Sequence, residues 1–72
     1  MIFERITMSN CIEFVRDLHG QYGTGWRVGK KYLIKLLAKD WNMAEDRISA
    51  FLVNCEIYHV QGICVTNKFV SF

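Results

Sequence analysis

The positions of apolar and polar residues predict a strand and then a helix at the start of this chain. Residues 2–7 (IFERIT) roughly alternate apolar with polar side chains, as a short strand with one buried face does. In residues 9–20, apolar side chains recur at the spacing of one helical face: Cys11, Phe14, Val15 and Leu18. Ser9 or Asn10 is suited to cap this helix, and Glu13 follows Asn10 by three residues, as in a capping box.

A glycine-rich loop and a second helix are expected in the middle of the chain. Residues 20–26 (GQYGTGW) contain three glycines, which is typical of a loop. The second helix is expected from Lys30 to about Trp41, because Gly29 disfavours an earlier start. Its broad apolar face consists of Leu33, Ile34, Leu36, Leu37 and Trp41. Residues 26–28 (WRV) are a candidate extended segment before it.

Residues 42–56 (NMAEDRISAFLVNCE) carry the clearest helical pattern. Asn42 is suited to cap this helix, with Glu45 three residues on, and acidic residues in a first turn suit the positive end of a helix dipole. Its expected buried stripe is Ile48, Phe51, Leu52 and Cys55.

The tail, residues 57–72, is rich in β-branched and aromatic residues, which favours a β-hairpin. Gly62 and the polar residues 66–68 (TNK) are the expected breaks, and the hairpin is expected to turn near the latter. The strand at residues 2–7 is a candidate third strand of the same sheet.

Length and composition indicate one domain with a real core. The chain has 72 residues, of which 51% are hydrophobic and 14% aromatic, and this argues against disorder. So many apolar residues on a small body also favour self-association or a protein partner. No apolar run is long enough for a signal peptide or a membrane span. Three cysteines, an odd number without paired spacing, are typical of reduced thiols in the cytoplasm.

The order strand, helix, helix, tight turn, helix and hairpin predicts one small α+β domain over residues 1–72. The stretch VGKKYLIKLLAKDWNMAEDRISAFLV looks like a helix-turn-helix core, and the hairpin would be its wing. The chain therefore resembles winged helix-turn-helix regulators, which implies a winged-helix-like fold with three helices, a C-terminal β-hairpin and a short N-terminal strand. The predicted core includes Ile12, Val15, Leu18, Leu33, Leu36, Leu37, Ile48, Phe51 and Leu52.

A row of basic residues is the main candidate for a functional surface. Four of its members are spaced by four and a fifth lies beside them: Arg27, Lys31, Lys35 and Lys39, with Lys30. On a helix the row would be about 18 Å long, at ~1.5 Å per residue. Such a row can contact several phosphates, because lysine is a flexible point charge. The alternative is the ordinary solvated face of an amphipathic helix.

The resemblance also implies a base-reading helix. In that family the second helix of the helix-turn-helix enters the major groove, which here is residues 42–56. Arg47 is placed to reach guanine and Asn54 adenine. Glu45 and Asp46 would face phosphates at the same end, so the positive charge lies on the preceding helix instead. Two interpretations stay open. The domain binds DNA in an unusual way, through the lysine helix, or the same fold binds a protein instead.

Three residues outside the helices are further candidates. Lys68 at the hairpin tip can contact a phosphate, or it is simply a turn residue. Trp26 and Tyr22 on the glycine-rich loop can stack on a base or a partner, and the favoured alternative is that they fold back onto the core.

Metal binding and catalysis have little support. Five residues are conceivable zinc ligands, but their spacing matches no common zinc site: Cys11, His19, Cys55, His59 and Cys64. The stretch GTGWRVGKK lacks the spacing of a phosphate-binding P-loop. No carboxylate pair or nucleophile motif is visible, so the sequence predicts no enzyme, no metal and no cofactor.

The sequence therefore predicts a small DNA-binding transcriptional regulator of phage or mobile-element type, acting as a cytoplasmic homodimer. Duplex phosphates would be held by Arg27, Lys30, Lys31, Lys35, Lys39 and Lys68, with Arg47 and Asn54 touching bases. The alternative is a protein-binding module, or a small inhibitor of a host protein complex, that uses the same fold without DNA. A structural subunit buried in an oligomer is a third possibility.

Overall fold

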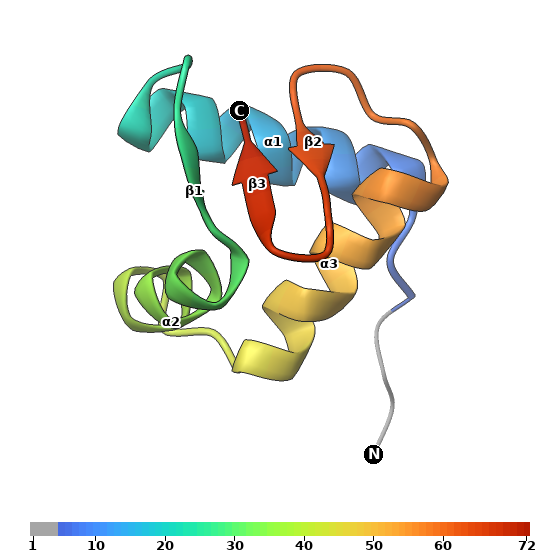
Figure 1. Ribbon diagram of the computed structural model, residues 1–72. Helices are drawn as coiled ribbons and strands as arrows, with labels where there is room; N and C mark the ends of the chain where they lie inside the picture. Colours follow the sequence, from blue (N-terminus) through green and yellow to red (C-terminus); the bar gives the residue numbers. More distant parts are fainter. Residues whose placement is uncertain (1–4) are drawn as a thin grey trace.

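The computed structural model describes residues 5–72 and is a small α+β fold (Figure 1). Its elements are α1 (Met8–Tyr22), β1 (Arg27–Gly29), α2 (Lys30–Asp40), α3 (Glu45–Ile57), β2 (Cys64–Val65) and β3 (Phe69–Ser71). The predicted fold class, with three helices and a C-terminal hairpin, is confirmed, and the arrangement is compatible with a small winged-helix-like domain. No helix in residues 5–72 is both long and apolar enough to cross a bilayer.

The sheet is antiparallel with strand order β1-β3-β2, so β3 is central. Val28 pairs with Val70, and Val70 pairs with Val65 on its other side. Because successive side chains of a strand point to opposite faces, this row of valines faces the helices. Val70 is fully buried there, so the sheet closes one side of the core.

The third strand comes from residues 27–29 and not from the predicted N-terminal strand. Of the predicted residues 2–7, residues 2–4 lie outside the described part of the chain, and residues 5–7 are not a strand. Thr7 is instead the N-cap of α1, where it accepts a hydrogen bond from the backbone N–H of Asn10. Residues 27 and 28 of the candidate extended segment 26–28 are thus in β1, whose backbone pairs with β3 and which ends one residue later, at Gly29.

The core lies between the three helices and the inner face of the sheet. Its buried side chains are Cys11, Phe14, Val15, Leu18, Leu33, Leu37, Ile48, Phe51, Leu52, Cys55, Val70 and Phe72. Seven of the nine predicted core residues are among them. The prediction that Ile12 belongs to the core is wrong, because Ile12 flanks the buried stripe of α1 and is 41% exposed. Leu36 is only partly buried.

The predicted helix caps are also corrected. α1 begins earlier than expected, and Thr7 and Asn10 form its capping box, without Glu13. The N-cap of α3 is Ala44, which offers no side-chain hydrogen bond. Asn42 lies in the turn before it with a φ of 50°, a conformation that asparagine tolerates better than most residues. Asn42 is therefore a residue of the turn between α2 and α3 and not the N-cap of α3. A cap at Asn42 would start α3 at residue 43, but α3 starts two residues later, at Glu45.

Candidate nucleic-acid interface

The predicted basic row is divided between a strand and a helix. Arg27 lies in β1, so it is not part of a helical row. Lys31, Lys35 and Lys39 keep their spacing on α2 and span about 12 Å at ~1.5 Å per residue. The expected single row of 18 Å is wrong, because Gly29 ends the strand and α2 starts only at Lys30.

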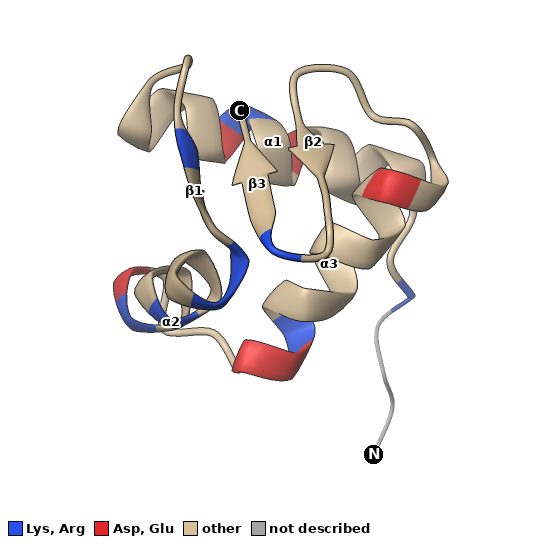
Figure 2. Ribbon diagram, viewed as in Figure 1, with Lys and Arg blue, Asp and Glu red and all other residues tan. Residues whose placement is uncertain are grey.

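The hairpin turn brings Lys68 to the start of α2. The backbone N–H of Lys30 donates to the carbonyl of Lys68, with 2.8 Å between N and O. Thr66 holds the turn, since its Oγ1 accepts from the N–H of Phe69 at 3.0 Å. Two basic residues 38 positions apart in the sequence are therefore neighbours, and Figure 2 shows the two basic segments side by side.

Arg27 lies on the outer face of the sheet. It alternates with the inward Val28, and its guanidinium carbon is 4.3 Å from the centroid of the Phe69 ring. A cation over an aromatic face is attracted by the ring quadrupole, which holds the side chain in place. Arg27, Lys30 and Lys68 thus belong to one surface, which continues along α2 through Lys31 and Lys35.

Apart from Asp40, the last residue of α2, acidic residues are absent from the segments that build this surface. Residues 18–39 and 57–72 contain six of the nine basic residues and none of the seven acidic ones. Within residues 5–72, no α2 lysine forms an ion pair with Asp17, Asp40 or Glu56. Asp40 instead accepts a hydrogen bond from the hydroxyl of Tyr22. The positive charges of these lysines are therefore available to a negatively charged partner.

α3 presents a different kind of face. The guanidinium carbon of Arg47 is 5.3 Å from the centroid of the Phe51 ring, and Arg47 is only partly exposed. The amide of Asn54 donates to the carbonyl of Ala50 at 2.7 Å. Both predicted base-contacting side chains therefore make contacts within α3.

The exposed positions of α3 are acidic at its start and include large apolar side chains beside Glu56 further on. Glu45 and Asp46 occupy the first turn. Val53 is 49% exposed and Ile57 is 63% exposed. Such a face suits a protein surface better than the polar edges of bases.

Three aromatic side chains near the basic residues are exposed. Trp26 is 55% exposed, so the expectation that it folds onto the core is wrong; its indole N–H donates to the Tyr22 carbonyl at 2.7 Å. Tyr22 itself packs against the core, as expected. The sequence analysis did not identify Tyr32 or Phe69 as exposed aromatic residues. For Phe69, only the register of β1 with β3 shows that its side chain faces outward and that of Val70 inward.

The described residues contain no cluster of three or more side chains suited to hold a metal ion. Cys11 and Cys55 meet in the core, where burial raises the pKa of Cys55 to about 12, with the Cys11 thiol adding to the effect. Cys64 is exposed on the outer face of the sheet, away from that pair. The candidate zinc ligands are thus divided between the core and the surface.

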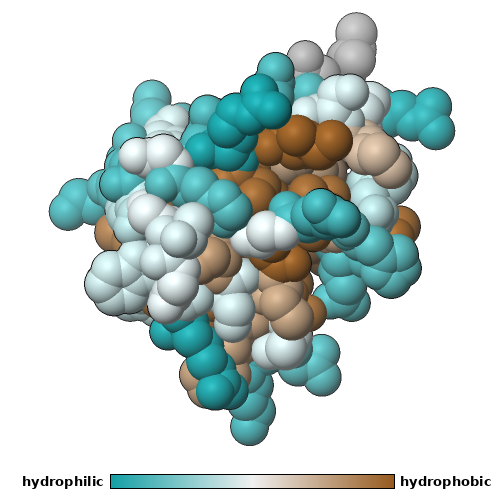
Figure 3. Space-filling model, turned by 90° about the horizontal axis from the view of Figure 1, so that it is seen from above, coloured by the Kyte–Doolittle hydropathy of each residue, from teal (hydrophilic) through white to brown (hydrophobic). Residues whose placement is uncertain are grey.

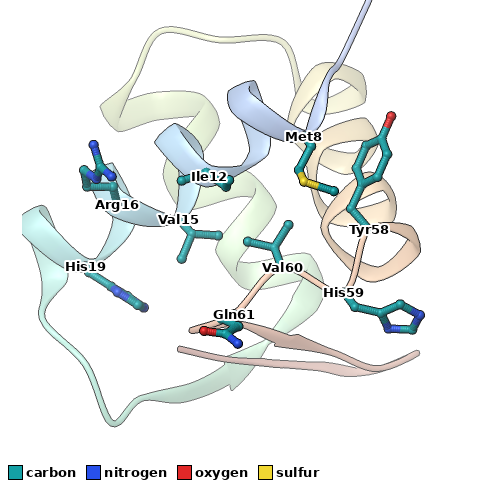
Figure 4. Close-up of a pocket in the computed structure, with 9 residues that line it drawn as sticks. All are labelled: Met8, Ile12, Val15, Arg16, His19, Tyr58, His59, Val60 and Gln61. Atoms are coloured by element: carbon teal, nitrogen blue, oxygen red, sulfur yellow. The ribbon is translucent and has the colours of Figure 1, made fainter.

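An apolar groove lies on another part of the molecule, between α1 and the connection from α3 to β2. It has a volume of about 490 Å³ and is lined by Met8, Ile12, Val15, Arg16, His19, Tyr58, His59, Val60 and Gln61 (Figure 4). Seen from above, apolar side chains gather in a hollow with hydrophilic ones around it (Figure 3). Sequence reasoning missed this groove because it placed Ile12 in the core.

The connection beside the groove is fixed by His19 and Gly62. A ring nitrogen of His19 lies 2.8 Å from the carbonyl oxygen of Gly62. Gly62 has a φ of +88°, and a Cβ there would lie 2.7 Å from the His19 ring. Only glycine fits this position without rearrangement, so the groove has a defined wall.

Comparison of the chain with protein-family models, with curated proteins and with solved structures gives no match.

Proposed function

We propose that this protein is a small DNA-binding transcriptional regulator that holds phosphates on one basic surface. The surface consists of Arg27, Lys30, Lys31, Lys35, Lys39 and Lys68. The observation that carries the proposal is the hydrogen bond from Lys30 to Lys68, which joins the hairpin tip to the lysine helix. Two basic features that are separate in the sequence are thereby neighbours in the fold.

The mechanism is occupancy. Lysine ammonium groups contact phosphates without a fixed geometry, and each contact releases a counterion from DNA. The protein would cover a site and block or recruit polymerase. Its resemblance to winged-helix regulators supports an origin in a phage or mobile element, and its three unpaired cysteines support a cytoplasmic location.

Fluorescence anisotropy with a labelled duplex tests the proposal. About four phosphate contacts predict a slope near −3.6 in a plot of log affinity against log salt, at roughly −0.9 per contact. We expect the double variant Lys31→Glu/Lys35→Glu to abolish this binding. The matched control, Arg5→Glu/Arg16→Glu, makes the same change in net charge at exposed residues outside the surface, and should retain most of the affinity. Equal loss in both variants, or no binding at low salt, would overturn the proposal.

A homodimer would extend the same mechanism. A two-fold dimer that reads symmetric half-sites should place its two α2 helices about 34 Å apart, one turn of DNA. Sedimentation velocity of the protein with duplexes that carry one or two half-sites gives the number of copies bound, and a dimer should bind the duplex with two half-sites one turn apart more tightly than the duplex with one.

The apolar groove favours a second candidate function, a protein-binding module. Met8 is 50% exposed and Ile12 is 41% exposed, although both are large apolar side chains. Binding of a partner would remove this surface from water. Sedimentation velocity of the wild type and of Ile12→Glu tests whether the groove mediates self-association. A monomer in both would exclude a second copy as its partner.

A further inference from the structure

Two exposed aromatic rings flank a position without a side chain on the basic surface. Gly29 pairs with Phe69 across the sheet, and it directly precedes α2, from which Tyr32 projects. A Cβ built on Gly29 would meet only the Cβ of Tyr32, at 3.9 Å, among atoms within 4 Å. The space above Gly29 is therefore open, with Tyr32 on one side and Phe69 on the other; we call it the Gly29 notch.

Both rings are available to a ligand. Tyr32 is 64% exposed and Phe69 is 39% exposed. Arg27 covers part of the Phe69 ring, and its planar guanidinium is itself a stacking surface. Exposed aromatic rings that contact no core are unfavourable in water, so a ligand that stacks on them would bury apolar area.

Cations surround the Gly29 notch. Arg27 lies two residues before Gly29, and Lys30 follows it directly. Lys68 precedes Phe69 and is bonded through its carbonyl to the Lys30 N–H. A ligand in the notch therefore meets aromatic faces at its centre and positive charges at its margins. This combination matches a nucleobase attached to a phosphodiester strand.

We propose that the Gly29 notch receives an unpaired base, so that the preferred ligand is single-stranded DNA. This inference rests on the proposed function, because the same cations hold the phosphates. A closed duplex stacks its bases on one another and offers no free face to Tyr32 or Phe69. A single strand, or a duplex that has been opened, offers both a free base and flanking phosphates.

The test compares three fluorescein-labelled oligonucleotides at one salt concentration: dT12, a 12-base-pair mixed duplex and rU12. We expect dT12 to bind at least about 10-fold more tightly than the duplex, the effect of one stacked base. rU12 separates DNA from RNA, since both carry unpaired bases. Tighter binding of rU12 than of dT12 would overturn the assignment to DNA.

Variants at Gly29 probe the notch directly. Its φ of −62° and ψ of 134° are open to any residue, so a side chain can be added there without backbone strain. We expect Gly29→Val to weaken dT12 binding about 10-fold and to leave duplex binding unchanged. Gly29→Ala is the matched control, because it also removes the glycine but leaves most of the space open. Tyr32→Ala changes an exposed ring and should reproduce the loss without affecting the fold.

The outcomes separate the two proposals. Binding of the duplex at least as tight as that of dT12, with no effect of Gly29→Val or Tyr32→Ala, would overturn the base-binding notch and leave the basic surface standing. Lys31→Glu/Lys35→Glu should weaken dT12 and the duplex alike. Absence of binding to all three oligonucleotides would overturn both proposals.

Discussion

At the scale of single residues, the three cysteines should differ in reactivity. Cys11 and Cys55 are buried and Cys64 is exposed. Burial raises the pKa of Cys11 and of Cys55, so both stay protonated and unreactive at pH 8. We expect Ellman's reagent to label one thiol rapidly in the folded protein and all three in denaturant. Cys64→Ser should remove the rapid phase, whereas three equal rates in the wild type would contradict the buried positions.

Cys55 and Tyr22 should make the fold sensitive to alkali. Burial, with the Cys11 thiol, raises the pKa of Cys55 from 9.0 to about 12. Burial, and then the hydrogen bond to Asp40, raises the pKa of Tyr22 from 10.0 to about 12. A pKa that is higher in the folded state means that the unfolded state loses its proton first. The stabilisation is therefore complete below about pH 9 and is lost as the pH rises towards 12.

Urea unfolding at pH 8 and at pH 10.5 measures this loss. The free energy of unfolding should be lower at pH 10.5, and the difference should be smaller in Tyr22→Phe, which cannot ionise. A free energy that rises with pH would contradict the direction of both pKa shifts.

At the scale of the elements, the starts of α1 and α3 differ in how they are capped. Thr7 and Asn10 satisfy one another: each backbone N–H donates to the other's side-chain oxygen at 3.2 Å. Ala44 begins α3 with extended dihedral angles but has no side chain that can accept a hydrogen bond. Because a helix start leaves backbone N–H groups without partners, α3 is less well stabilised there than α1.

Removing the cap side chain of α1 and adding one to α3 should have opposite effects on stability. Thr7→Ala should lower the free energy of unfolding by about 1 kcal/mol, and Ala44→Ser should raise it by about 1 kcal/mol. Thermal unfolding measures both, because 1 kcal/mol shifts the Tm of a domain of this size by roughly 4–8 °C. Thr24→Ala, an exposed loop threonine, is the control and should leave the Tm unchanged. A destabilising Ala44→Ser would show that the cap position is wrong.

The helices could be predicted because their burial follows a period that the sequence carries. Phe51 and Leu52 recur with Ile48 at helical spacing, and all three are buried. The hairpin was predicted from its β-branched residues and its turn. Three residues alone do not identify β1, because a strand this short is defined by its pairing with β3. The caps failed for a related reason: Ser9, Asn10 and Thr7 are all suitable side chains, and only backbone geometry selects one.

The sequence predicted which basic residues form the candidate site, but not how the fold arranges them. Lys31, Lys35 and Lys39 could be placed on one helical face from their spacing alone. Lys30 and Lys68 are neighbours because of a hydrogen bond between two distant segments of the chain. The Gly29 notch depends on the register that pairs Gly29 with Phe69. Neither the tertiary contact nor the register is encoded in local periodicity.

At the scale of the whole molecule, cations gather on one surface, and their mutual repulsion affects the stability of the fold. In residues 5–72 the acidic residues lie on α1, at the end of α2 and on α3, while β1, most of α2 and the turn before β3 carry cations only (Figure 2). Arg16 on α1 and Arg47 on α3 are the cations that share a helix with several acids. Neighbouring cations such as Lys30 and Lys68 repel one another in the folded state, and unfolding relieves this repulsion. A polyanion bound to the surface should do the opposite, because it binds the assembled surface and not the separated segments.

Bound DNA should therefore raise the Tm of the whole domain. At a ligand concentration of 100 times the Kd, the folded state gains about 2.7 kcal/mol if the unfolded chain does not bind. For a domain of this size that corresponds to a rise in Tm of more than about 10 °C. Circular dichroism at 222 nm follows the helices with dT12 or duplex present. Added salt should reduce the rise, since it weakens phosphate contacts, and Lys31→Glu/Lys35→Glu should show none. A rise that is unaffected by salt would mean that the ligand is held by something other than the basic surface.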